Sequence, residues 1–171
     1  RSRFLLIFIF GGLMQAANAQ DLSAYRKGNF IRGTGSLPYR ILYPEHYDPQ
    51  KAYPLIIFLH GSAQRGNDNA RQLIHGGGFF LKDSIRSRFP SIVLFPQCGQ
   101  NSTWSYFNFS FDTARRRVNL IFTFQEKPKE YALLLKQLAD SLVESGLIDT
   151  SRIYIGGLSL GGFGTWDFIE R

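Results

Sequence analysis

A serine set between two glycines is the feature of this sequence that best suits covalent catalysis. The segment Gly157-Leu158-Ser159-Leu160-Gly161 follows a short apolar run, Arg152–Ile155, and precedes an apolar, helix-like segment. A serine hydroxyl is a weak nucleophile that must stand open to substrate and base, which a sharp strand-to-helix turn achieves. Glycines two residues away on each side relieve the crowding in such a turn. The pattern predicts that Ser159 is a nucleophile and that Gly157 and Gly161 form its elbow.

Two further segments have the right place to stabilise an oxyanion. The amide of Leu160 would lie at a helix N-terminus, where a negative charge is favoured. His60-Gly61-Ser62 follows the most apolar strand, expected at 54–60, and the loop after such a strand donates the second amide in serine hydrolases of this architecture. We expect that donor to be the amide of Ser62 or of Ala63, and the sequence does not choose between them.

The sequence supplies no histidine in the position expected of a general base. In hydrolases whose serine lies on a strand-to-helix elbow, the base follows the serine in the sequence. Because His60 precedes Ser159, we interpret His60 as a residue that structures its loop. After Ser159 the only carboxylates are Asp167 and Glu170, and no histidine follows. Asp167 is too close to the elbow to be the distal acid and is expected at the surface or beside packed residues. We therefore expect the catalytic Asp and His beyond Arg171, and the 171 residues expressed alone to be insoluble or inactive.

Apolar runs alternate with helical patterns along the chain, which indicates one α/β domain with a parallel sheet. Strands are expected at 38–44, 54–60, 91–95 and 152–155, after a lead-in at 21–35 with at most an edge strand. An inserted strand is expected at 119–124. Helices are expected at 70–74, at 79–89, from Pro128 to Gly146, and from Gly161 onward.

Three segments carry a resemblance to a known family. They are LIIFLHGSAQRGNDN at 55–69, IVLFPQ at 92–97 and DTSRIYIGGLSLGGFGTW at 149–166. They resemble secreted esterases termed predicted peptidases, relatives of poly(3-hydroxybutyrate) depolymerases and of feruloyl and acetylxylan esterases in the α/β-hydrolase superfamily. The resemblance implies a Ser-His-Asp triad, no cofactor, and hydrolysis of a small-molecule or polysaccharide-linked ester. It also implies the N-terminal portion of an α/β-hydrolase fold, with a mostly parallel sheet, flanking helices and the later strands missing. Residues 97–127 depart from the pattern.

Two other functions share these motifs. A serine peptidase of prolyl-oligopeptidase type has the same elbow, and a non-catalytic binding protein on this fold would suit the absent histidine. The aromatic residues Trp104, Tyr106, Phe107 and Phe109 would line an acyl or sugar subsite, or else pack in the core or a lid.

Composition places the chain among globular proteins, and its N-terminal segment indicates export. The 171 residues suffice for one domain, and the net charge of +7 becomes +5 once Arg1 and Arg3 are subtracted. Residues 1–19 read as a signal peptide and 20–171 as the hydrolase domain, so we expect a secreted or periplasmic protein without a stable membrane anchor. Cys98 is a lone cysteine, and no cluster of ligating residues suggests a metal. The run Arg115–Arg117 is interpreted as a solvated face, and no nucleic-acid-binding motif is present.

Overall fold

The computed structural model describes residues 21–171, and the expected signal peptide at 1–19 lies outside them. Five strands form one sheet in the order β1-β2-β4-β3-β7. Their bounds are β1 Arg26–Arg32, β2 Gly35–Leu42, β3 Tyr53–Leu59, β4 Ile92–Pro96 and β7 Ile148–Gly157. No helix within the described range is long and apolar enough to cross a membrane.

The sheet is mixed, because its two halves pair differently. β4, β3 and β7 pair in parallel, whereas β1, β2 and β4 pair antiparallel. β1 and β2 are joined by a tight turn in which Gly33 has φ +57°. The edge strand expected in the lead-in is therefore β1. The parallel pairing predicted for the apolar strands is confirmed for β4, β3 and β7, which position the elbow.

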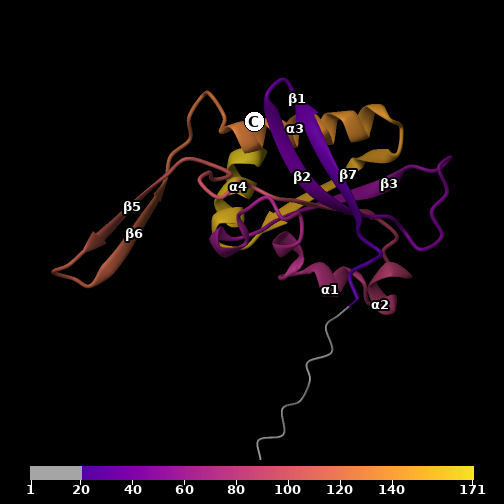
Figure 1. Ribbon diagram of the computed structural model, residues 1–171, viewed down its shortest axis with the longest axis horizontal. Coiled ribbons are helices and arrows are strands. Elements are labelled where there is room, and N and C mark those ends of the chain that lie inside the picture. The colour runs from indigo at the N-terminus through magenta and orange to yellow at the C-terminus, as the bar shows by residue number, and fades with distance from the viewer. Residues whose placement is uncertain (1–20) are drawn as a thin grey trace, which may run out of the picture.

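Alternate residues of β3 enter two separate apolar layers. Leu55, Ile57 and Leu59 face one layer, while Ile56 and Phe58 face the other. Helices α3 (Glu130–Glu144) and α4 (Leu160–Ile169) cover the first face. The second is covered by the 3-10 turn Arg71–Leu73 and by α1 (Gly77–Phe80), with α2 (Asp83–Arg86) next to it (Figure 1). A strand covered on both sides reads as a continuous apolar run, as the sequence predicted here.

The helix predictions were right for α3 and wrong for the segment at 79–89. α3 presents Leu134, Leu135 and Leu138 to the core, and the chain leaves it at Gly146, which has φ +77°. The single helix expected at 79–89 is two short helices instead. Lys82 between them is extended, with φ −63° and ψ 131°, so the helical hydrogen bonds cannot continue through it.

Between β4 and α3 the chain forms an antiparallel hairpin of β5 (Phe107–Asp112) and β6 (Arg117–Phe122). The strand expected at 119–124 is thus present, starting two residues earlier and with a partner that was not predicted. Figure 1 shows this hairpin extending away from the body of the molecule.

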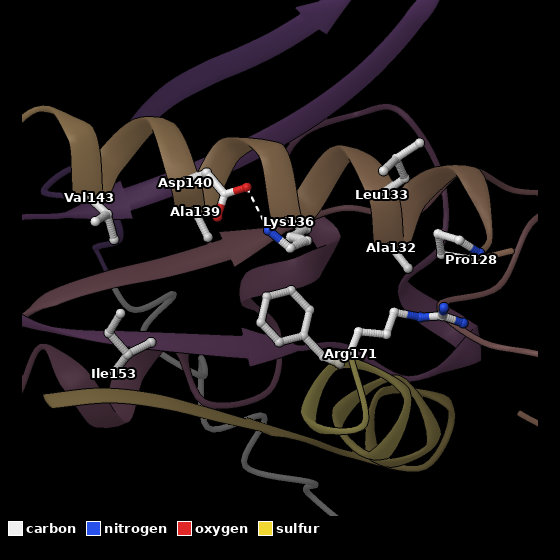
Figure 2. A pocket seen from close by; sticks show the side chains of 10 residues that line it. Pro128, Ala132, Leu133, Lys136, Ala139, Asp140, Val143, Ile153 and Arg171 are labelled. Atoms are coloured by element: carbon white, nitrogen blue, oxygen red, sulfur yellow. Dashed lines mark hydrogen bonds and ion pairs between the residues drawn. The ribbon is translucent and has the colours of Figure 1, made fainter. Parts of the chain in front are cut away.

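β7 lies at one edge of the sheet, and apolar side chains near it are exposed. Within residues 21–171 it pairs only with β3, and Ile153 and Tyr154 are 40% and 56% exposed. A pocket of about 180 Å³ lies between α3, α4 and β7. Figure 2 shows its walls, which are apolar apart from Arg171 and the exposed pair Lys136–Asp140.

Candidate active site

Ser159 occupies a strained turn between β7 and α4. β7 ends at Gly157, α4 begins at Leu160, and Ser159 between them has φ 52° and ψ −114° with an exposed side chain. A positive φ is uncommon for a residue other than glycine, and such strain is concentrated at functional sites. The turn directs the hydroxyl into solvent above the carboxyl end of the sheet, as a nucleophile requires.

The two elbow glycines are required because the turn packs directly on β3. A β-carbon on Gly157 would lie 2.5 Å from the carbonyl atoms of Gly161 and 2.8 Å from the carbonyl oxygen of Leu59. A β-carbon on Gly161 would overlap that same oxygen of Leu59. Neither contact can be relieved by moving a flexible side chain, because both involve backbone atoms. The spacing of these glycines therefore reflects the close approach of two backbone segments.

The loop after β3 lies beside the elbow. The N–H of Leu158 donates a 3.1 Å hydrogen bond to the carbonyl of Leu59. A β-carbon on Gly61 would lie 3.7 Å from Cβ of Ser159. The loop then continues as a 3-10 turn, Ser62–Gln64, whose first two residues are exposed. The structure thus brings together the segments that the sequence assigned to the nucleophile and to the oxyanion loop.

Three amides in this region have no partner within the part of the chain that the structure describes. Among residues 21–171, no group accepts a hydrogen bond from the N–H of Ser62, Ala63 or Leu160, whereas the N–H of Gln64 is bonded to the carbonyl of Gly61 at 3.3 Å. Leu160 is the first residue of α4, so its N–H precedes the first intrahelical hydrogen bond. These amides are the groups of the site that can donate to a developing negative charge.

His60 is buried beneath the loop with both ring nitrogens engaged. Its Nε2 accepts a 3.0 Å hydrogen bond from the N–H of Cys98, which leaves Nδ1 to carry the proton 2.6 Å from the carbonyl oxygen of Gly61. The indole of Trp104 donates to the carbonyl of His60 at 3.1 Å. Burial lowers the pKa of His60 below its usual value. These contacts agree with its interpretation as a loop-structuring residue.

A buried glutamine, Gln97, holds the far end of the same loop. Its side-chain nitrogen donates to the carbonyl of Gln64 at 3.1 Å and to Oδ1 of Asp68 at 2.9 Å, and its oxygen accepts from the N–H of Asn69 at 2.7 Å. Gln97 is fully buried. Sequence reasoning did not assign it a role, although a glutamine directly after the buried strand β4 was visible as part of IVLFPQ.

A family profile described as Putative esterase matches residues 34–165. The chain belongs to this esterase family. A comparison with curated proteins finds no match.

Solved structures support the same fold for this esterase-family chain. It is similar to a thermostable esterase, with 32% identity and a TM-score of 0.70 over 86% of this chain and 38% of that one. A ferulic acid esterase shares the fold, with 18% identity and a TM-score of 0.55 over 82% of this chain and 52% of that one. The esterase-family chain therefore has an α/β-hydrolase fold and spans about half or less of the length of these two proteins.

Asp167 of this esterase-family chain is buried. Of the two positions expected for it, at the surface or beside packed residues, the surface position was wrong. It is 1% exposed on α4, and Arg171 one turn later binds both of its carboxylate oxygens, at 2.8 and 3.0 Å. Because a buried carboxylate needs such a partner, Asp167 is occupied in a structural pair.

The aromatic residues around the start of the hairpin lie in different environments, and their expected role in an acyl or sugar subsite stays a prediction. Trp104 is a core residue at 1% exposure, and Gly164 of α4 packs so closely on it that a β-carbon there would overlap. Phe107 stacks on Phe163 of α4 at 5.4 Å, whereas Phe109 is 64% exposed. The apolar pocket of Figure 2 contains none of the elbow or loop residues and is separate from the candidate site.

Proposed function

We propose that this protein hydrolyses carboxylic esters through an acyl-enzyme formed on Ser159. The observation that supports this most directly is the exposed serine in a strained strand-to-helix turn, with the loop after β3 lying against it. Membership of the esterase family agrees with that chemistry. Neither the chemistry of the whole protein nor its substrate follows from membership alone, because the matched esterases are longer than this chain.

In the proposed reaction, Oγ of Ser159 attacks the ester carbonyl carbon while its proton passes to a general base. The carbonyl oxygen becomes an oxyanion, which accepts hydrogen bonds from the amide of Leu160 and from that of Ser62 or Ala63. Collapse of the tetrahedral intermediate releases the alcohol, which takes the proton from the base. Water then attacks the acyl-enzyme by the same steps in reverse and releases the acid.

We propose that the base is a histidine encoded beyond Arg171, oriented by a carboxylate that also lies there. The reason is that the ring nitrogens of His60 are both engaged, while Asp167 is paired with Arg171. His46 and His75 lie outside the motif and have exposed side chains. Neither His60 nor Asp167 is therefore free to take the proton.

The test is hydrolysis by the full-length protein of matched ester and amide substrates, namely p-nitrophenyl acetate with p-nitroacetanilide, and methyl ferulate with ferulamide. We expect ester hydrolysis at rates that fall by roughly four to six decades in Ser159→Ala. Faster cleavage of the amides would favour a peptidase of prolyl-oligopeptidase type. Ester hydrolysis that Ser159→Ala leaves unchanged would contradict the proposal, and no turnover of any substrate would favour the binding-protein alternative.

We further propose that the protein is exported and that its signal peptide is cleaved after Ala19. The proposal rests on the basic residues Arg1 and Arg3, the apolar run that follows them, and Ala17-Asn18-Ala19. N-terminal sequencing of the protein recovered from the periplasm or medium should begin at Gln20. Recovery of the uncleaved chain from the cytoplasm alone would contradict export.

A further inference from the structure

The β5–β6 hairpin has one apolar face along its whole length. The register pairs Phe107 with Phe122 and Phe111 with Val118, and Phe109 lies between the two pairs on the same side of the ribbon. Phe109, Phe111 and Val118 are 64%, 54% and 52% exposed. Isolated apolar side chains are normal at a protein surface, but a continuous row of large ones is not. Such a row indicates that a binding partner covers it.

The opposite face of the hairpin is mostly polar. Asn108, Ser110 and Asp112 alternate with the phenylalanines of β5, and Asn119 of β6 lies opposite Ser110. Ile121 is the exception on this side. The hairpin is therefore an amphipathic ribbon, with a period of two where an amphipathic helix would have a period of 3.6.

Cations are concentrated at the tip of the same ribbon. Arg115, Arg116 and Arg117 are all exposed, and the nearest carboxylate, Asp112, lies 4.0 Å from Arg115. Three cations against one anion leave a local charge of +2. The sequence alone favoured a solvated face for this arginine run, but the structure places it beside an exposed apolar surface.

The base of the hairpin is attached to the helix that follows Ser159. Phe107 stacks face to face on Phe163 of α4, with ring planes 15° apart. Beyond β6, Arg171 donates to the carbonyl oxygens of Gln125 and Glu126 while it binds Asp167 of α4. The hairpin is therefore anchored where β5 meets α4, the helix that follows Ser159, and a partner of the hairpin would lie on that side of the molecule (Figure 1).

We propose that the hairpin docks on an anionic lipid bilayer surface, with its apolar face against the acyl boundary and its arginines at the phosphate groups. A ribbon that is apolar on one side and polar on the other suits the plane of such an interface, as amphipathic helices do. Each arginine near an anionic surface adds to binding, which explains why the cations cluster on this element. The proposed contact is peripheral, with the hairpin lying in the interface.

The test is sedimentation of the full-length protein with vesicles of phosphatidylglycerol and phosphatidylcholine, and with vesicles of phosphatidylcholine alone. We expect binding only to the anionic vesicles, weakened by salt. The variant R115Q/R116Q/R117Q should bind about a hundredfold more weakly, from about fivefold for each cation. The variant F109S/F111S should lose at least about tenfold.

Matched controls remove the same charge and the same apolar area elsewhere. K27Q/R32Q/R88Q lowers the net charge by the same three units at exposed positions, and I74S/F89S removes side chains that are 62% and 60% exposed. Both should bind the vesicles as the wild type does, and every variant should keep the wild-type circular dichroism and melting temperature. Equal binding to neutral vesicles, equal loss in the controls, or no binding by the wild type would overturn the proposal. So would a wild-type dimer in solution that dissociates in F109S/F111S, because a second copy would then cover the face.

Discussion

The main-chain N–H of Cys98 donates a 3.0 Å hydrogen bond to Nε2 of His60, so the histidine at the start of the loop beside Ser159 has no free nitrogen with which to accept the proton of the serine. Nδ1 carries the hydrogen and faces the carbonyl of Gly61. The neutral ring links the end of β4 to the start of the oxyanion loop. These contacts agree with the interpretation of His60 as a residue that structures its loop.

His60 should make the protein less stable in mild acid. Burial lowers the pKa of His60 in the folded state, while the unfolded value stays near 6.5. The unfolded chain therefore binds the proton first, so the contribution is complete above about pH 6.5 and is lost as the pH falls from there to the folded pKa. Thermal melts from pH 8 to pH 5 should show a smaller loss of melting temperature in His60→Gln than in the wild type. His75→Gln, at an exposed position, should follow the wild type, and an unchanged slope in His60→Gln would refute this account of the ring.

Gly157 and Gly156 are neighbours on β7 that should respond to alanine with very different losses of stability. A β-carbon on Gly157 meets backbone atoms at 2.5 Å, whereas one on Gly156 meets nothing within 4 Å. Gly157→Ala should lower the free energy of unfolding by about 3 kcal/mol or more, because the backbones must separate. Gly156→Ala should change it by less than about 1 kcal/mol. Chemical denaturation of the two variants measures both, and equal losses would show that the elbow is not tightly packed.

The strain at Ser159 should be measurable as a difference between two inactive variants. Alanine keeps the positive φ of 52° unfavourable, while glycine tolerates it. Ser159→Gly should therefore be more stable than Ser159→Ala by about 1 kcal/mol, after the entropic cost of glycine is subtracted. The melting temperatures should differ by roughly 2–4 °C. A less stable glycine variant would mean that the turn relaxes once the serine is gone.

Gln97 should act on catalysis through the position of the oxyanion loop. Gln97→Leu removes three hydrogen bonds at similar volume and should cost about 1 kcal/mol of stability for each. In the full-length enzyme, kcat should fall by tens of fold with KM little changed, because a displaced amide stabilises the transition state less well. Asn67→Ala, on the exposed part of the same loop, should leave kcat within about twofold. A rise in KM at constant kcat would instead place Gln97 in substrate binding.

Features that depend on local spacing were predictable from the sequence. The glycines around Ser159 are fixed by contacts with a single carbonyl, that of Leu59, and their spacing is visible without any tertiary information. The apolar runs of β3, β4 and β7 likewise reflect strands packed in the sheet. The helix from 130 to 144 was visible because one stripe of leucines faces the core.

Features that depend on contacts distant in the sequence were not predictable in the same way. Gln97 reaches Asp68 and Asn69 across about 29 residues, and Arg171, the partner of Asp167, also binds the carbonyl oxygens of Gln125 and Glu126, which lie 46 and 45 residues earlier. Only the second strand of the hairpin was predicted, although Phe107, Phe109 and Phe111 alternate with polar residues in the first. Their exposure was not, because the same alternation is typical of a strand that packs on a core.

The most direct test of the central claim is covalent labelling of the full-length protein with a fluorophosphonate, followed by peptide mass spectrometry. Ser159 should be the one modified residue, with labelling abolished in Ser159→Ala and retained in Ser62→Ala, which keeps the amide of residue 62. A probe attached to any other residue, or a folded full-length protein that Ser159 leaves unlabelled, would contradict it.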